Sequence, residues 1–337
     1  MGDFLNALAL FSNFVVVPAM AYGSQLALGA LGVTIIYGIL RFSNFAHGEI
    51  MSFGAMVSLL FIWWFQDLGI SVAPVPTALI ALPPAILITV LALLLIDRFI
   101  FRFYRIKKSP PVTLLIASTG VMFLLNGVIR FIIGPYDRRV SDGERFIITV
   151  REFKEATGLL QGIALKTSQA LSFGFAAICT VLLFWFLSRT RAGKSMRAYS
   201  DNEELALLSG VNPDRVVMIA WIIAGTLAVF AGTLYGLDKS YKPFTYLQLL
   251  LPIFAAAIVG GIGRPVGAIV GGFIIAFSEI TVTYAYKRVA TYLLPSQWAP
   301  EGLVQLLGTD YKFAVSFFIL VAVLLIRPTG IFRGQSL

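Results

Sequence analysis

Residues 75–96 read VPTALIALPPAILITVLALLLI, a stretch without a single charged side chain. A helix needs about 20 consecutive apolar residues to cross the hydrocarbon core of a lipid bilayer. Within that core no water satisfies the backbone amide and carbonyl groups, and a helix satisfies them inside its own segment. The stretch therefore predicts a membrane-spanning helix.

Similar apolar runs, bounded by charged residues or by Pro and Gly, recur on both sides of this stretch. The seventh and ninth runs along the chain are short for a span, so each is expected to be re-entrant, buried or extended by its neighbours. The sequence thus predicts an all-α fold, a polytopic transmembrane bundle of about eight to ten spans, in a single domain that covers residues 1–337. The nine expected spans lie at approximately residues 18–40, 45–65, 75–96, 112–133, 168–187, 213–237, 249–262, 266–286 and 313–326.

The composition of the 337-residue chain excludes an ordinary soluble domain. Hydrophobic residues make up 58% and charged residues 13%, with a mean hydropathy of +0.86, whereas soluble domains are roughly half apolar and about a quarter charged. The net charge of +9 fits basic residues that flank spans beside anionic headgroups, so we expect no nucleic-acid partner. One cysteine, Cys179, and one histidine cannot build an internal disulfide or a familiar zinc site, so we expect no metal and no cofactor.

Basic residues are densest in two short connections between spans. The preference of Lys and Arg for the inner side places both connections in the cytoplasm. With nine spans, the N-terminus is then outside and the C-terminus inside, and the longest polar insertion, residues 134–167, is an external loop. Alternation in residues 145–150 suggests a short strand or an amphipathic patch there. The basic residues are Arg98, Arg102, Arg105, Lys107 and Lys108 in the first connection, and Arg189, Arg191, Lys194 and Arg197 in the second.

The second connection belongs to a cytoplasmic loop, residues 189–212, whose most informative segment is residues 200–210. Ser200 and Glu203 have the spacing of a capping box, in which each side chain satisfies an amide at the start of a helix. Gly210 is placed to end that helix in a left-handed conformation. We therefore expect a capped helix of about two turns between two spans.

This short helix has an apolar face and a polar face. Leu205 and Leu208 share one face, while the remaining polar side chains are available to water or a partner. Asn212 can cap the next helix with Pro213 at its first position, which makes a rigid corner. Such a helix can transmit force from another protein; alternatively, it lies on the membrane surface. The polar side chains are those of Asp201, Asn202, Glu203 and Glu204.

Residues 37–55, YGILRFSNFAHGEIMSFGA, join the first two expected spans. His47 lies two residues from Glu49 at the start of an otherwise apolar helix, and Asn44 is suited to cap that helix. Polar groups inside a membrane are retained mostly where they face a pathway or one another. These three residues are therefore candidates for a translocation pathway; the alternative is that they satisfy one another at the cytoplasmic interface and never meet substrate.

Other ionisable groups in the spans are few. Glu279, in the eighth span, is a fourth pathway candidate. Its alternatives are a hydrogen bond to Thr281 or Thr283, or pairing across helices. Asp97 and Arg130, at the ends of spans, are expected to be interfacial anchors whose side chains extend toward the headgroups.

The third segment is residues 260–272, GGIGRPVGAIVGG. Gly263, Gly267 and Gly271 recur every four residues, which would line one helix face with small residues and let another backbone approach. A dinucleotide fingerprint is excluded because the third glycine and the strand context are missing. Residues 188–195 resemble a phosphate loop only in part, since Ser188 replaces its first glycine and an apolar span precedes it.

These segments resemble the permease family of branched-chain amino-acid ABC transporters. Residues 191–215 look like its cytoplasmic coupling loop, residues 44–49 like its Asn-Phe-Ala-His-Gly-Glu signature, and residues 260–272 like the corresponding glycine-rich region. The resemblance covers residues 18–331 approximately. In that family the coupling loop docks into a groove on the ATPase subunit, and the resemblance assigns this contact to Asn202, Glu203, Glu204, Leu205, Ala206 and Gly210.

The resemblance implies a multi-pass permease of the bacterial cytoplasmic (inner) membrane, not an enzyme. The chain would form the pathway of an ATP-driven importer for branched-chain or related amino acids. Its expected partners are two cytoplasmic ABC ATPases, a second homologous or identical permease subunit, an external periplasmic solute-binding protein and the lipid bilayer. Alternatives are an ABC permease for urea or short amides, or an ion-coupled secondary transporter that uses His47, Glu49 or Glu279 as a proton relay.

Overall fold

The computed structural model describes residues 2–70, 76–139, 145–293 and 302–332. Within these residues nine helices are long and apolar enough to cross a membrane, which confirms the predicted all-α polytopic bundle. The expected beginning of the third span at Val75 lies outside the described residues. The nine candidate spans are Gly2–Leu40, His47–Asp67, Ala78–Ile106, Pro111–Ile133, Thr167–Arg189, Pro213–Lys239, Pro243–Gly260, Pro265–Thr283 and Thr309–Ile326.

Several spans are longer than the apolar runs suggested, and three of them are informative. The first is a continuous helix of 39 residues, made of α1, a π-helical turn at Ser12–Val16 and α2. The seventh and ninth spans each reach 18 residues, because Pro243 starts one helix early and a 3-10 turn at Thr309–Tyr311 leads into the other. The seventh and ninth runs were expected to be re-entrant, buried or extended by neighbouring residues, and the structure shows that both are extended.

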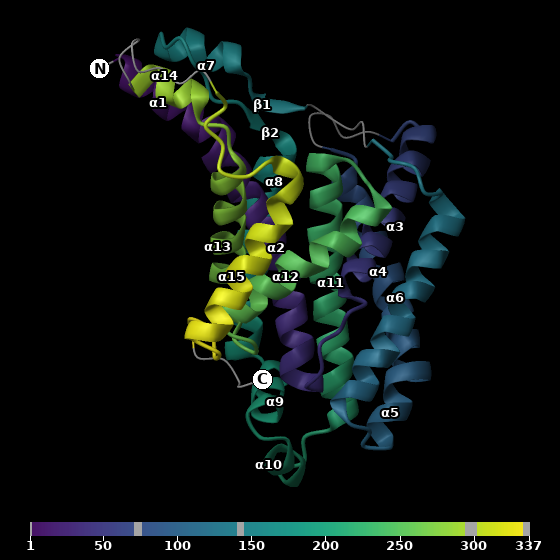
Figure 1. Cartoon of the computed structure of the whole chain (residues 1–337). Helices are drawn as coiled ribbons and strands as arrows, with labels where there is room; N and C mark the ends of the chain where they lie inside the picture. Colours follow the sequence, from purple (N-terminus) through teal and green to yellow (C-terminus); the bar gives the residue numbers. More distant parts are fainter. Residues whose placement is uncertain (1, 71–75, 140–144, 294–301, 333–337) are drawn as a thin grey trace.

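Figure 1 shows the helices of the bundle and the smaller elements that connect them. The helices are α1 (Gly2–Phe11), α2 (Val17–Leu40), α3 (His47–Asp67), α4 (Ala78–Ile96), α5 (Arg102–Ile106), α6 (Pro111–Ile133), α8 (Thr167–Arg189), α11 (Pro213–Lys239), α12 (Pro243–Gly260), α13 (Pro265–Thr283) and α15 (Lys312–Ile326). The smaller elements are β1 (Phe146–Ile148), α7 (Val150–Thr157), β2 (Leu165–Lys166), α9 (Arg191–Asp201), α10 (Glu203–Leu208) and α14 (Lys287–Leu293).

Helix α2 is the centre of the bundle. It is apolar on all sides and almost fully buried, which is the pattern of a helix surrounded by others. Helices α8, α11, α12 and α13 pack around it. Glycine permits a close approach of two backbones here: a Cβ at Gly272 of α13 would lie 2.7 Å from the backbone nitrogen of Ala27.

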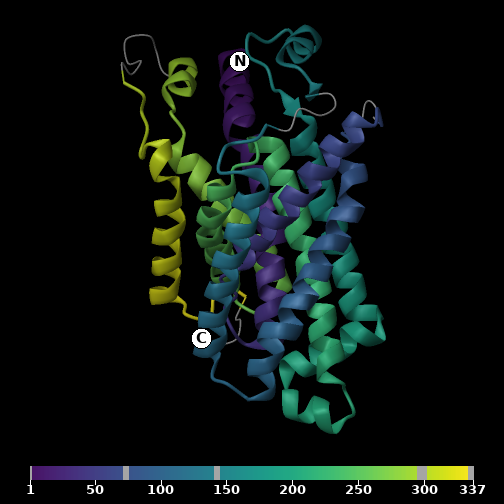
Figure 2. The ribbon, with the colours of Figure 1, turned by 90° about the vertical axis from the view of Figure 1, so that its right-hand side faces the viewer.

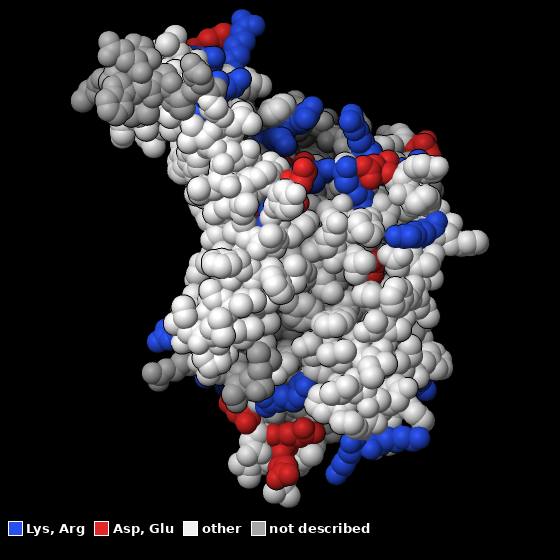
Figure 3. All heavy atoms as spheres, in the orientation of Figure 1, with Lys and Arg blue, Asp and Glu red and all other residues white. Residues whose placement is uncertain are grey.

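The outer helices turn apolar side chains outward. Phe131 of α6 is 90% exposed and Leu325 of α15 is 80% exposed, an exposure that water would penalise and lipid accepts. Figure 3 shows on one face a broad band with few charged side chains, with most Lys, Arg, Asp and Glu gathered at the two ends. The surface therefore has the pattern of a bilayer-embedded protein.

The two ends of the bundle carry different polar elements. Near the N-terminus, α1 lies beside α14, and α7 and the antiparallel pair β1–β2 lie at the same end (Figure 1). The strand suggested within residues 145–150 is thus present as β1. At the other end α5, α9 and α10 lie with the C-terminus (Figures 1 and 2). The basic connections therefore share one end and residues 145–167 lie at the opposite end, an arrangement that agrees with the expected topology.

Helices α12 and α13 pack backbone to backbone at the glycine-rich segment. A Cβ at Gly267 would overlap the carbonyl oxygen of Gly260, and one at Gly271 would overlap that of Ala256. The prediction that Gly263 shares one helix face with Gly267 and Gly271 is wrong. Gly263 precedes α13, which begins at Pro265, and its φ of 82° places it in the turn, a conformation that glycine adopts without steric cost.

Candidate functional site

Helices α9 and α10 form a short module that projects beyond the spans at the end with the C-terminus (Figures 1 and 2). The module begins in a tight turn after α8. The hydroxyl of Thr190 accepts a hydrogen bond from the amide of Gly193 at 3.0 Å, which caps α9. A Cβ at Gly193 would overlap the backbone of Phe186, so α9 folds back closely against the end of α8.

The junction between α9 and α10 differs from the predicted capping box. Ser200 lies inside α9, and Asn202 is the residue that caps α10, because its side-chain oxygen accepts the amide of Leu205 at 3.1 Å. Glu203 instead accepts a hydrogen bond from the hydroxyl of Tyr199 at 2.7 Å. Burial, together with the Glu203 carboxylate, raises the pKa of Tyr199. The prediction of Ser200 as the cap is wrong because Asn202, an equally strong N-cap residue, adopts the extended backbone required.

Helix α10 presents apolar side chains to the surroundings. Leu205 is 61% and Leu208 85% exposed, while Ala206 between them is buried. Gly210 ends the module with a φ of 81°, the left-handed conformation that was expected. Exposed leucines on a helix beyond the spans are typical of a surface that binds another protein.

A polar corner follows the module. The side-chain oxygen of Asn212 accepts the amide of Arg215 at 3.2 Å, and Pro213 is the first residue of α11, as the sequence predicts. The guanidinium of Arg41, just after α2, donates to the carbonyl of Ser200. The module is therefore joined to the ends of both α2 and α11.

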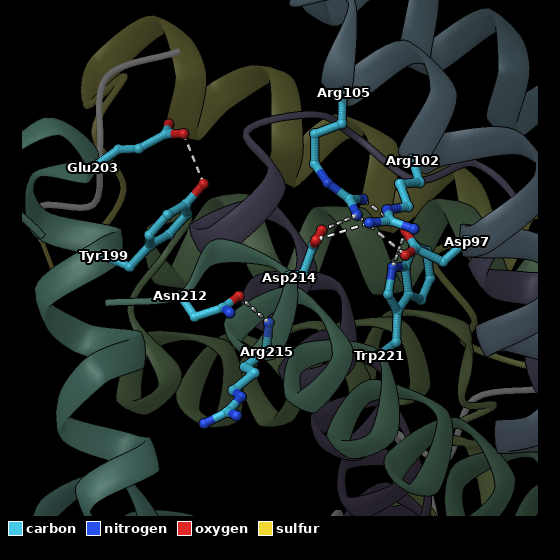
Figure 4. A network of polar contacts seen from close by, with 9 residues as sticks. All are labelled: Asp97, Arg102, Arg105, Tyr199, Glu203, Asn212, Asp214, Arg215 and Trp221. Atoms are coloured by element: carbon cyan, nitrogen blue, oxygen red, sulfur yellow. Dashed lines mark hydrogen bonds and ion pairs between the residues drawn. The ribbon is translucent and has the colours of Figure 1, made fainter. Parts of the chain in front are cut away.

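A charged network ties the start of α11 to α4 and α5 (Figure 4). Arg105 donates to both carboxylate oxygens of Asp97, at 2.7 and 3.2 Å, and the indole of Trp221 donates to the same carboxylate at 2.9 Å. Arg102 pairs with Asp214 at 3.0 Å. Asp97 is buried, so its expected role as an interfacial anchor is wrong; its partners Arg105 and Trp221 hold it inside the protein.

The polar break between α2 and α3 lies inside the bundle. Helix α2 ends at Leu40, and the connection then rises beside it, so that α3 begins midway up the bundle (Figure 1). His47 lies against Gly32, where an added Cβ would be 2.6 Å from the imidazole. Gly32 is about 12 Å along α2 from Leu40. His47 therefore lies beside the interior of α2 and not at the end of that helix.

The three polar side chains of this break have partners other than one another. The imidazole of His47 is hydrogen-bonded to the backbone of Gly29. Asn44 accepts the amide of Ala46 at 3.1 Å just before α3, and Glu49 accepts from the side chain of Asn126, on α6, at 2.9 Å. In the described part of the chain, Nδ2 of Asn44, Nε2 of His47 and Oε2 of Glu49 have no hydrogen-bond partner. The side chains of Asn44, His47 and Glu49 therefore do not form hydrogen bonds with one another, in contrast to the predicted alternative.

Helix α6 supplies two partners that the sequence reasoning missed. Ser118 accepts the amide of Phe45 at 3.1 Å, which satisfies irregular backbone at membrane depth, and Asn126 pairs with Glu49. The available signal was that each is a polar residue within an apolar span. Their partner elements, however, are more than 70 residues away and could not be assigned from spacing.

Glu279 lies near the opposite end of the bundle, on α13, and is 1% exposed. The hydroxyl of Ser316, on α15, donates to its carboxylate, so it pairs across helices; Thr283 reaches only its backbone carbonyl, at 2.7 Å. The carboxylate lines a cavity of about 250 Å³. No cluster of three or more potential metal ligands occurs in the part of the chain that the structure describes.

Comparison with known proteins gives one consistent result over nearly the whole chain. A family model described as "Branched-chain amino acid transport system / permease component" matches residues 15–324. The high-affinity branched-chain amino acid transport system permease protein LivH of Salmonella typhimurium is 29% identical over 313 residues, which are 92% of this chain and 91% of the relative.

Two further relatives come from other organisms. The Pseudomonas aeruginosa permease protein BraD, of the same description, is 26% identical over 316 residues, 94% of each chain. A probable branched-chain amino acid transport permease protein of Methanocaldococcus jannaschii is 30% identical over 328 residues, covering 96% of this chain and 93% of the relative. No solved structure matches.

Proposed function

The chain belongs to the family of branched-chain amino acid transport permease components, and on that premise we propose that it is one permease subunit of an ATP-driven importer for branched-chain amino acids. It is a multi-pass membrane protein. We place it in the bacterial cytoplasmic membrane, beside a second permease subunit that is homologous or identical. An external solute-binding protein delivers the amino acid, and two cytoplasmic ATPases supply the energy.

The exposed apolar face of α10 carries this proposal. Leu205 and Leu208 are more than half exposed on a short helix that projects past the spans (Figure 1). Together with Asn202, Glu203 and Glu204 they form the surface that we assign to the ATPase, with Gly210 ending the helix. Ala206 was expected in this contact, but its side chain is buried and is therefore not part of the surface. A helix lying on the membrane surface would turn the same leucines toward lipid; the projection of α10 beyond the spans favours a protein partner.

The polar corner after α10 gives force a route into the membrane. Asn212 caps α11 immediately after the module, and Asp214, in the first turn of α11, pairs with Arg102 of α5. A movement of α10 therefore reaches α11 through a rigid corner and reaches α4 and α5 through charged pairs. This is how a partner that hydrolyses ATP would drive the spans.

We further propose that the translocation pathway passes the break between α2 and α3. A helix N-terminus carries unpaired amides and a positive partial charge, and such ends at mid-membrane depth suit anionic groups of a passing solute. Unpartnered polar atoms of Asn44, His47 and Glu49 lie at the start of α3. Glu279 lines the cavity at the other end and is the fourth pathway residue in this proposal.

Reconstitution tests the function. The chain, its partner permease and the ATPases are placed in proteoliposomes, and uptake of radiolabelled leucine is measured with the solute-binding protein and ATP. ATP-dependent accumulation is expected. Accumulation driven by a proton gradient without any ATPase would show a secondary transporter instead. A solute-binding protein that binds urea and ignores leucine would overturn the substrate class.

A further inference from the structure

The cavity beside Glu279 is built where four segments meet near the N-terminal end of the bundle. Its walls come from residues 14–22 of the first span, the last turns of α11 and α13, and the beginning of α15. It measures about 250 Å³. A water molecule occupies about 30 Å³ in the liquid, so the cavity has the volume of roughly eight water molecules. A small metabolite has a similar volume.

The cavity contains a buried carboxylate that is only half satisfied. Oε1 of Glu279 accepts the hydroxyl of Ser316, whereas Oε2 has no hydrogen-bond partner among the described residues. A buried carboxylate without a partner is costly, and within a membrane such a group is retained mostly where it has a function. The Tyr22 hydroxyl lies beside this carboxylate and is also without a partner in the described residues. Oε2 of Glu279 and this hydroxyl are therefore both available to a ligand.

Positive charge lies in the same cavity without cancelling that carboxylate. Lys312 is one of the lining residues, and its ammonium lies 5.6 Å from the centre of the Tyr22 ring. It attracts the Glu279 carboxylate electrostatically, but no ion pair joins the two in the described residues. Lys239, also in the lining, pairs with its neighbour Asp238 at 3.3 Å. The cavity thus offers separate acidic and basic groups.

The rest of the lining is largely apolar or aromatic. Phe14, Pro18 and Ile280 provide apolar surface, and Tyr22, Tyr235 and Tyr284 provide rings. A ligand that matches this cavity has an ammonium group, a carboxylate and a small aliphatic body. Urea and short amides carry neither charge, so they would leave Glu279 unpaired, which costs binding free energy.

We propose that this cavity binds a free zwitterionic aliphatic amino acid, with the carboxylate of Glu279 receiving its ammonium group and the ammonium of Lys312 receiving its carboxylate. This inference rests on the proposed importer function and adds a substrate site within the permease itself. The site lies at the end of the bundle opposite α10, where a solute released by an external binding protein would arrive first.

The test measures binding of radiolabelled leucine to the assembled complex in nanodiscs without the solute-binding protein. Two unlabelled competitors each lack one charge: leucinamide has no carboxylate and 4-methylpentanoate has no ammonium group. Each should compete at least about tenfold more weakly than leucine, because a hydrogen bond to a charged group is worth about 1.5–3 kcal/mol.

The variants assign each charge to its residue. Glu279→Gln should remove the preference for leucine over 4-methylpentanoate, and Lys312→Gln the preference over leucinamide, each to within about twofold. Glu155→Gln, on exposed α7 at the same end, is the matched control and should leave both preferences unchanged. ATP hydrolysis by each complex reports assembly.

Failure of the site and failure of the function give different results. If the wild-type complex, with its binding protein and ATP, transports no leucine, the proposed function is overturned. If it transports leucine but both competitors displace leucine as well as leucine itself does, or if the variants keep the wild-type preferences, the cavity is not the site. If neither variant assembles, the competition measured on the wild type decides.

Discussion

Two short polar connections between helices lie in different surroundings: one is outside the spans, and the other is inside the bundle. Between α9 and α10 the interruption lies outside the spans, and its backbone groups are satisfied by neighbours in sequence, as when Asn202 caps Leu205. Between α2 and α3 the interruption lies inside the bundle, and beyond its local bonds it takes partners from α6, as when Ser118 accepts the amide of Phe45. The second break therefore depends more than the first on the tertiary fold.

This difference determines what each break can do. At the outer break, water can form hydrogen bonds with any polar group that has no partner in the protein. The side chains there are therefore not needed to satisfy the backbone and can serve to bind a partner protein. The inner break has no water to rely on, and each polar atom without a partner raises the free energy of the folded state. The unpartnered atoms of Asn44 and His47 therefore indicate a functional role for the inner break. The exposed leucines of α10 indicate instead that a partner protein binds there.

The largest effect is expected at the outer break. Replacement of Leu205 and Leu208 together by Asp should lower ATP-dependent uptake at least about 100-fold, because central apolar anchors of an interface each contribute about 2 kcal/mol or more. Co-purification of the ATPases with the permease should fall in parallel. Leu160→Asp, at an equally exposed leucine near the opposite end (68%), is the control and should keep both. Full ATPase binding by the double variant would show that α10 is not the docking helix.

The next effect tests the close packing of the inner break. A Cβ at Gly48 would lie 2.6 Å from the backbone oxygen of Tyr246, whereas a Cβ at Gly120 would meet nothing within 4 Å. Gly48→Ala should destabilise the protein by about 1–3 kcal/mol through overpacking. Gly120→Ala should stabilise it by up to about 1 kcal/mol, because alanine favours the helix. Thermal unfolding in detergent measures both, and equal shifts for the two variants would contradict the packing described.

A third variant removes a partner of the inner break. Asn126→Ala takes away the hydrogen bond to Glu49 and should cost about 1–3 kcal/mol, since a buried acceptor is left without a donor. Thr119→Ala, on the same helix, removes only a bond to its own backbone at Leu115 and should cost less. Thermal unfolding again gives the comparison. A loss for Thr119→Ala as large as that for Asn126→Ala would mean that the Glu49 contact adds nothing.

The smallest effect returns to the outer break. Asn202→Ala should destabilise α10 by about 1 kcal/mol, the usual worth of an N-cap side chain, while Asn202→Asp should keep the helix. Hydrogen exchange at the amide of Leu205 should become faster in the first variant and remain slow in the second. If exchange there is unaffected by Asn202→Ala, the cap does not come from Asn202.

Most of the features that the sequence predicts correctly depend on local interactions. The spans follow from apolar length, and the corner at Asn212 and Pro213 follows from capping chemistry. Residue 200 was mistaken for the cap because Ser200 and Asn202 both suit that position, and only the backbone decides between them. The depth of His47 and the pairing of Glu49 with Asn126 could not be predicted, because both depend on how distant helices pack.

The 39-residue first helix has a consequence for distance outside the membrane. At 1.5 Å per residue it is about 58 Å long, against a hydrocarbon core of about 30 Å. Its first turns therefore stand clear of the lipid, and α14 braces them through a small cluster around Leu10 and Val289. The beginning of this helix therefore projects from the end of the bundle as a rigid element. A soluble protein that binds at this end must have a surface shaped to accommodate the projecting helix.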